Sequence, residues 1–384
     1  KNGLLLPGEH ESLASIVSFT YHDYDAFYGI KTLHSKQLSA YLNVFYENFL
    51  DKKNRHKIDI GTSYQFDGYH ETFNDSLQLR LESVPGLFTQ YSFILDDKFV
   101  AILGLRGDIH NQYGLFLTPR FHFKWQFIES TSLRASAGKG YRAPNVYIEN
   151  TNILNSSRTL VFEEKMKAEE AWNIGASITH TVKTKGKEST FIIDYFYTDF
   201  TNQTIINLDR DPQHAYFYNT NGKKSFAHSA QIEMMIYPFK GFEIIAAYRF
   251  NYVMQEIDGK MLEKSLHSKH KALLNVGYAT KFEKWKFNIT GQFHGAQRLP
   301  STSSNPEIHQ RGDYSPHFFT FNAQITKKFK YIDIYVGGEN LSNYRQKNPI
   351  IAAEDPFGKY FDSSIIWGPI DGIMIYGGIR LTLK

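Results

Sequence analysis

Apolar and polar residues alternate along many stretches of this chain. Between Trp285 and Phe293, apolar side chains occupy positions 285, 287, 289 and 293, and polar side chains occupy every even position. The same period of two recurs at 172–179, 244–252 and 375–384. Because successive side chains of a β-strand point to opposite faces, each stretch predicts a strand with one apolar and one polar face.

Read in this way, the chain contains about sixteen strands joined by connections that alternate between short and long. The expected strands span approximately 14–28, 35–49, 56–70, 87–95, 98–110, 115–127, 130–143, 169–182, 188–203, 215–238 (with a loop entry), 241–255, 269–282, 285–298, 317–329, 331–341 and 373–383. The expected long connections are 144–168, 204–222, 256–268, 299–316 and 342–372. Short turns at one end and long loops at the other are typical of outer-membrane barrels. We therefore predict an all-β fold, a transmembrane antiparallel β-barrel that forms a single domain over residues 1–384.

Composition supports a membrane barrel over a soluble one. Aromatic residues make up 16% of the chain, yet its mean hydropathy is −0.41. No run of about 18 apolar residues is present, and a closed barrel is the other structure that pairs every backbone group in lipid. The alternative, a soluble all-β sandwich, would have shorter loops and fewer aromatics near strand ends than Tyr195, Tyr197 and Phe200 provide. The net charge of +4 is spread out, so no nucleic-acid partner is expected.

Three short motifs occur in a characteristic order. The first is Gly104–Asp108, followed by Thr118–Arg120, and the second is Gly138–Pro144, which contains Gly140, Arg142, Ala143 and Pro144. The third, Gly337–Arg345, contains Asn340, Leu341 and Tyr344. In order and spacing the three motifs resemble those of TonB-dependent outer-membrane receptors, although Ser342 stands where that family usually has Phe.

The resemblance implies a larger assembly than these residues alone. Barrels of this family have 22 strands and a plugged lumen. About six N-terminal strands, the plug and the segment that contacts TonB would then lie outside this chain, in the same or a separate polypeptide. The expected partners are that plug with its strands, periplasmic TonB and the lipid of a Gram-negative outer membrane, and a surface lipoprotein is left open. The family usually ends in an aromatic residue, whereas this chain ends Leu383-Lys384.

The motif residues also have plain structural interpretations. Pro144 lacks an N–H and would end a strand at the barrel rim. Arg142 is expected either to pair with an acidic group of a loop or plug, or to join a salt-bridge network in the lumen. Asn340 and Asn343 are expected to cap a turn through bonds from side chain to backbone.

No catalytic motif is found, so an enzyme is not expected, and no cofactor is expected. The 15 histidines show no metal-ligand spacing, and the absence of cysteine excludes thiolate ligands, so no metal site is predicted. Aromatic and histidine residues of the long loops are the ligand candidates, since rigid rings with polar tips bind large ligands well. They are Tyr147, His214, Tyr216, Tyr218, His309, Tyr314, Tyr360 and Trp367. Packing of the loops against one another is the alternative interpretation, and loops 144–168 and 349–369 are expected to shape the mouth.

The function implied by the resemblance is active, TonB-dependent uptake of a scarce, bulky nutrient. The cargo expected first is a metal complex, namely a ferric siderophore, haem or cobalamin. Uptake of an oligosaccharide or peptide is an alternative, and strand count alone leaves open a complete sixteen-stranded passive porin.

Overall fold

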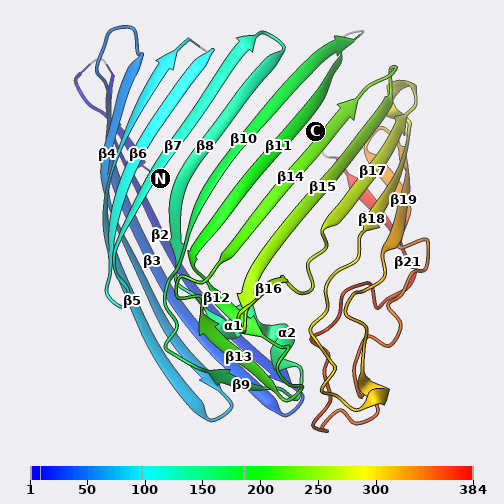
Figure 1. The fold of residues 1–384 in the computed structure, drawn as a ribbon. Helices are drawn as coiled ribbons and strands as arrows, with labels where there is room; N and C mark the ends of the chain where they lie inside the picture. Colours follow the sequence, from blue (N-terminus) through cyan, green and yellow to red (C-terminus); the bar gives the residue numbers. More distant parts are fainter. Residues whose placement is uncertain (1, 9, 97, 185–186, 383–384) are drawn as a thin grey trace.

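The structure is a computed structural model that describes all residues except 1, 9, 97, 185–186 and 383–384. Its main element is one antiparallel sheet of 18 strands that curves as a barrel wall (Figure 1). The long strands are β2 (Glu11–Tyr28), β3 (Lys31–Phe49), β4 (His56–Phe73), β5 (Ser76–Leu95), β6 (Phe99–His110), β7 (Gly114–Ile128), β8 (Thr131–Arg142), β10 (Glu169–Thr184), β11 (Lys187–Asn202), β14 (Ser225–Ile236), β15 (Phe242–Ile257), β17 (His270–Ala279), β18 (Trp285–His294), β19 (Phe318–Lys328), β20 (Ile332–Glu339) and β21 (Met374–Leu381).

Each long strand pairs with its neighbours in chain order. Two short strands complete the sheet: β1 (Asn2–Leu5) pairs with β2, and β16 (Lys260–Glu263) pairs with β15. Within the described residues, β21 pairs only with β20 and β1 only with β2, so the sheet is not closed. The all-β prediction is confirmed, and the structure has a wall strand at each expected position except 215–238, which divides into two strands.

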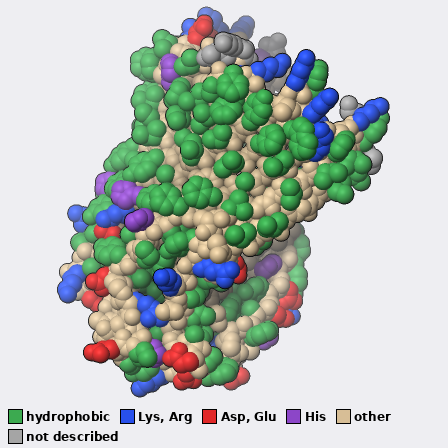
Figure 2. Space-filling view, turned by 90° about the vertical axis from the view of Figure 1, so that its right-hand side faces the viewer, with side chains coloured by type: hydrophobic (Ala, Val, Ile, Leu, Met, Phe, Trp, Pro, Cys, Tyr) green, Lys and Arg blue, Asp and Glu red, His purple; other side chains and the backbone are tan. Residues whose placement is uncertain are grey.

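The alternation seen in the sequence places apolar side chains on the outer face. Trp285, Phe287 and Ile289 on β18 are 41%, 38% and 57% exposed on that face. Polar side chains of β4 to β6, among them Asp67 and Asp108, are instead buried along the inner face. Figure 2 shows the outer apolar side chains as a broad hydrophobic belt. No helix in the described part of the chain is long and apolar enough to cross a membrane.

Short turns join the strands at one end of the wall. From β2 to β8, short turns join the strands at the other end as well. β4 and β5 are joined through Asn74, whose φ of 51° suits a tight turn. β5 therefore begins at Ser76, earlier than the expected start at 87. The reason is that Leu77, Leu79 and Leu81 continue the alternation with their side chains exposed. About ten residues cross a membrane, so these strands of 18 and 20 residues form a hairpin that projects beyond it.

The long loops contain secondary structure of their own. Loop 143–168 holds the short helices α1 (Val146–Glu149) and α2 (Thr151–Leu154) and strand β9 (Thr159–Phe162). Strands β12 (Thr204–Asn207) and β13 (His214–Asn219) join β9 in a three-stranded sheet. The 3₁₀ turns η1 (Lys281–Glu283) and η2 (Glu307–His309) lie in later connections.

The prediction of one strand over 215–238 is wrong. The region divides into β13, which belongs to the small loop sheet, and β14, which belongs to the barrel wall. Asn221 and Gly222, with φ of 51° and 81°, turn the chain between them. An Asn-Gly pair is a strong turn signal, because both residues adopt positive φ readily.

Candidate ligand-binding mouth

The long connections gather at the end of the wall opposite the short turns (Figure 1). They bury apolar cores of their own there. One core contains Ile153, Leu208, Ala215 and Phe217 from two different loops. A second contains Leu299, Ile351, Ala352 and Ile365. Since buried apolar area stabilises ordered structure, these loops form a packed layer and not a set of independent chains.

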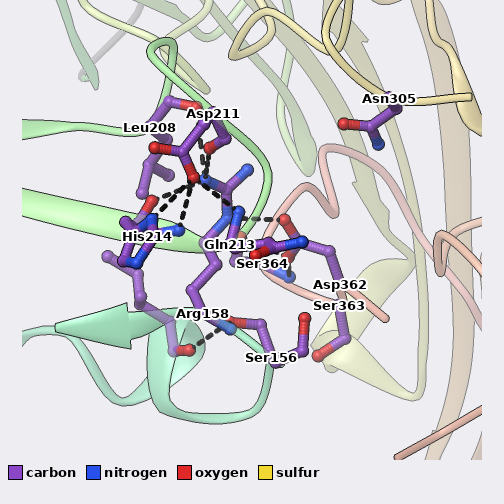
Figure 3. A network of polar contacts seen from close by, with 12 residues as sticks. Ser156, Arg158, Leu208, Asp211, Gln213, His214, Asn305, Asp362, Ser363 and Ser364 are labelled. Atoms are coloured by element: carbon purple, nitrogen blue, oxygen red, sulfur yellow. Dashed lines mark hydrogen bonds and ion pairs between the residues drawn. The ribbon is translucent and has the colours of Figure 1, made fainter. Parts of the chain in front are cut away.

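A buried arginine joins three of these loops. Arg158 is 2% exposed, and its Nε donates to Oδ2 of Asp362 at 2.8 Å. Its Nη1 donates to the backbone oxygens of Leu208, Asp211 and His214 at 3.3, 2.8 and 2.9 Å (Figure 3). The guanidinium therefore finds partners in both 203–224 and 340–373, as a buried charge requires.

Asp362 adds further bonds to this junction, by which we mean Arg158, Asp362 and the backbone oxygens that Arg158 contacts. Its Oδ1 accepts hydrogen bonds from the N and Oγ of Ser364 at 2.7 and 2.6 Å. Its backbone exchanges hydrogen bonds of 2.9 and 3.1 Å with Ile351. From the barrel wall, Nζ of Lys31 donates to the backbone oxygens of Ser156 and Arg158 at 2.6 and 2.7 Å. The junction thus fastens the loop layer to β3.

Three further ion pairs cross between loops. Arg298 contacts Asp209 at 3.1 Å, which ties 295–317 to 203–224. Arg210 contacts Asp258 at 2.6 Å and also pairs with Glu163. The hydrogen bonds from Arg210 lower the pKa of Asp258 below its ordinary value. Five long connections are therefore linked by charged contacts as well as by apolar packing.

Two of the expected ligand residues lie inside this layer. Tyr147 is 7% exposed, stacks on Phe73 with ring centroids 5.2 Å apart, and accepts a hydrogen bond from Gln78 at 2.9 Å. Tyr218 is 6% exposed and packs with Ile205 and Ile257. Tyr147 therefore packs its loop against the β4–β5 hairpin, and Tyr218 packs the small sheet against the end of β15.

His214 and Tyr216 share one carboxylate. Asp211 lies 2.9 Å from Nδ1 of His214 and accepts a hydrogen bond from the hydroxyl of Tyr216 at 2.7 Å. Burial acts to raise the pKa of Asp211, but these bonds and one from the Gln213 N–H outweigh it, so the pKa is lowered. The guanidinium of Arg210 lies 4.7 Å from the Tyr216 ring, which completes a polar cluster at the edge of the small sheet.

The other four expected residues belong to the last two loops. Tyr314 is 53% exposed. His309 lies 3.8 Å from Glu354 and 5.9 Å, between ring centroids, from Tyr360. Nζ of Lys359 lies 4.8 Å from the Tyr360 ring. Trp367 packs beside Phe318, with centroids 5.9 Å apart. The eight expected residues are thus divided between two regions of the mouth and do not form one cluster.

Comparison with known proteins identifies the family. The sequence matches a family model described as "TonB dependent receptor-like, beta-barrel" over residues 8–341. The chain belongs to the TonB-dependent receptor family. No curated protein sequence matches it. Membership of this family implies the outer membrane of a Gram-negative bacterium.

Solved structures of TonB-dependent receptors share the fold. The ferric enterobactin receptor PfeA of Pseudomonas aeruginosa, as a mutant with enterobactin, has a TM-score of 0.67 at 14% identity over 97% of this chain and 62% of its own. The copper transporter OprC has 0.69 at 11% identity, over 97% and 63%. The FrpB iron transporter of Neisseria meningitidis has 0.63 at 13%, over 91% and 55%. The chain thus spans less than two thirds of the length of these receptors.

The motif residues of the TonB-dependent receptor occupy the rim between wall and loops. Arg142, at the end of β8, contacts Glu149 of α1 at 2.8 Å and donates through Nε to Glu169 of β10 at 3.0 Å. It thus pairs with an acidic loop group, one of its two expected roles. Gly140 lies two residues before it in β8, and Ala143 and Pro144 follow it, with the Pro144 oxygen accepting a hydrogen bond from Arg80 at 3.0 Å.

The later motif of the receptor forms a capped turn. Asn340 donates to the backbone oxygens of Tyr344 and Asp371 at 2.8 and 3.0 Å, and its Oδ1 accepts from the Tyr344 N–H at 3.1 Å. Leu341 donates its N–H to Phe321 at 2.7 Å. Tyr344 stacks on Phe318 with centroids 4.8 Å apart. Asn340 therefore caps the turn as its residue type predicts.

The inner face of the receptor wall contains a polar hollow of about 550 Å³. Its lining includes Asp67, Glu82, Arg106, Asp108 and Arg142. Charged groups of both signs face one another there, and Arg106 contacts Asp108 at 2.6 Å. Such a surface can bind polar groups of a ligand or of another protein segment. Among the described residues, no group of three or more His, Asp and Glu side chains is arranged to hold a metal ion.

Sequence reasoning did not identify the junction between Arg158 and Asp362. The two residues are 204 positions apart, and each is flanked by serines that carry no distinctive signal. The local bonds at the two sites run only between near neighbours: the Arg158 N–H donates to Oγ of Ser156, and the Ser364 N–H donates to Oδ1 of Asp362.

Proposed function

We propose that this chain forms the wall and mouth of an active importer that captures a bulky metal complex, first of all a ferric chelate. The observation that carries the proposal is the ordered loop layer, fastened by the buried Arg158–Asp362 pair. A pre-organised surface lowers the entropy cost of binding a large ligand. A passive porin needs no such surface.

The cargo is inferred from mouth chemistry and from related receptors. Lys359 beside Tyr360 offers a cation and an aromatic ring at one point of the last loop. Anionic chelates with ring-shaped ligands are recognised by this combination. Structures with the same fold include receptors and transporters named for ferric enterobactin, copper and iron. Oligosaccharide or peptide uptake is the second candidate.

Binding to the purified full-length receptor tests the cargo. We expect an iron complex of a catecholate or hydroxamate to quench tryptophan fluorescence saturably, because Trp367 lies in the last loop. Tyr360→Ala with Lys359→Gln should weaken that binding about tenfold, by removing one ring and one charge. Lys260→Gln, at an exposed position on β16, is the matched control and should bind as the unmodified receptor does.

A panel of haem, cobalamin and a maltooligosaccharide completes the measurement. Saturable binding of the oligosaccharide alone would overturn the metal-complex assignment in favour of the second candidate. Uptake by cells separates import from diffusion, because the proposed mechanism needs a plug and TonB. Uptake that persists unchanged in cells lacking TonB would instead support a porin.

A further inference from the structure

The short-turn end of the wall carries lysines that have no carboxylate partner. Lys183 pairs with Glu188, and Lys286 and Lys328 share Glu283. In the described part of the chain, no carboxylate lies within ion-pair distance of the remaining lysines at the turns that follow β10, β14, β17 and β19. They are Lys187, Lys240, Lys281, Lys284, Lys327 and Lys330. Figure 2 shows basic side chains along this edge of the hydrophobic belt.

Most of these lysines lie against an aromatic ring. Nζ of Lys327 is 4.2 Å from the Trp285 ring and 5.8 Å from the Phe329 ring. Lys281 lies 5.2 Å from Phe282. Lys330 lies 5.0 Å from Tyr331, and Lys187 lies 4.3 Å from Tyr237. The pattern recurs at successive turns, so it is a property of this edge and not of one turn.

Trp285 and Lys327 lie on the outer face of the wall, which faces the lipid. Trp285 and Lys327 are direct partners in the register of β18 and β19. Trp285 shares its face with Phe287 and Ile289, and Lys327 shares its face with Ile325, all of them exposed members of the belt. Phe329 and Phe282 extend the belt beyond the strands and are 52% and 76% exposed. A partner that contacts this edge from outside must therefore be compatible with lipid.

We propose that this edge, defined by Lys281, Phe282, Trp285, Lys327, Phe329 and Lys330, binds the phosphate of anionic phospholipids in the adjoining leaflet. Lysine stems lie along apolar surface while their ammonium groups reach the head-group level. Tryptophan and tyrosine rings favour the same level. Unpaired lysines near that surface attract anionic lipids. The proposal concerns the lipid around the receptor and is independent of its cargo.

Lipid retention by the purified full-length receptor tests this edge. Native mass spectrometry in detergent would measure the affinity for phosphatidylglycerol and for phosphatidylcholine. We expect phosphatidylglycerol to bind more tightly, and Lys327→Gln with Lys330→Gln to weaken it about fivefold or more. The variant positions lie at the end of the wall, so heat-modifiable gel mobility should show an intact fold.

The matched control is Lys286→Gln with Lys328→Gln. These residues follow Trp285 in β18 and Lys327 in β19 and carry the same charge, but their side chains alternate to the opposite face and pair with Glu283. The control should change the affinity less than twofold. Equal weakening in the two double variants, or equal affinity of the unmodified receptor for the two lipids, would overturn the proposal. So would displacement of phosphatidylglycerol by millimolar inorganic phosphate, which would indicate a site for the free ion.

Discussion

At the scale of single residues, the mouth depends on one buried charge. Arg158 would be costly to bury alone, because an unpaired guanidinium loses its hydration. Asp362 and three backbone oxygens replace that hydration. Those oxygens belong to the segment that leads from β12 into β13, so the arginine also holds that segment in place.

Removing the arginine should therefore loosen the loops without unfolding the wall. We expect Arg158→Met to reduce the local stability of the loop layer by about 3–5 kcal/mol, because Asp362 is left buried without its cation. Hydrogen exchange of amides in 156–162, 208–217 and 351–365 would measure the loss. Arg345→Met, at an exposed position, is the control and should leave exchange unchanged.

A second variant separates charge from packing. Arg158→Met combined with Asp362→Leu removes both charges, and much of the protection should return. If Arg158→Met alone exchanges as slowly as the unmodified receptor, the buried pair does not hold the layer together.

At the scale of elements, alternation made the strands predictable. Each strand carries its own period of two, so its existence can be read locally, as Trp285, Phe287 and Ile289 show. The same local reading misjudged 215–238, because the aromatic run Tyr216–Tyr218 also forms a strand, but one that belongs to the loop sheet. Which sheet a strand joins depends on distant partners, and the alternation of one segment does not record them.

The two faces of one strand should respond differently to charge. Ile289 is 57% exposed on the outer face, whereas the neighbouring Asn288 faces the interior beside Gly277. Ile289→Lys should reduce stability by about 2–4 kcal/mol, as a lysine does near the middle of the lipid layer. Asn288→Lys should cost much less. Urea unfolding of the receptor in lipid vesicles would measure both, and equal losses would contradict the assignment of faces.

Ligand candidates were less predictable than strands. Residue type placed Tyr314 and Tyr147 in one group, yet the former is 53% exposed and the latter 7%. Their difference comes from the packing of α1 against Leu33 and Phe73, residues more than seventy positions away in sequence. A loop residue can be recognised from sequence, but its exposure is decided by which other loops cover it.

At the scale of the whole molecule, the barrel wall and the loop layer are stabilised by different kinds of contact. The wall is held by continuous backbone pairing between neighbouring strands, whose hydrogen bonds do not titrate. The loop layer depends in addition on the carboxylates of Asp211, Asp258 and Glu164. Oε1 of Glu164 accepts hydrogen bonds from the Asn219 N–H and from Nδ2 of Asn221 at 2.9 and 2.8 Å. The loop layer should therefore lose stability at a higher pH than the wall does.

Acid should destabilise the loop layer, because the pKa values of these three carboxylates are lowered in the folded protein. The pKa of Asp258 is lowered from 3.8 chiefly by its hydrogen bonds to Arg210. The pKa of Asp211 is lowered from 3.8 and that of Glu164 from 4.5, although burial opposes both shifts and hydrogen bonds outweigh it. A carboxylate with a lowered folded pKa stabilises the fold fully above its unfolded pKa, and that stability is lost as pH falls through the folded value.

We therefore expect the loop layer to keep its full stability above about pH 5 and to open below about pH 4, before the wall unfolds. Hydrogen exchange, corrected for the intrinsic rate at each pH, would compare amides of 204–219 with those of β18 and β19. The loop amides should lose protection first, and the strand amides should retain it. Simultaneous loss in both regions would mean that the layer and the wall form one cooperative unit. In that case, ligand-driven movement of the loops could not occur without strain in the barrel.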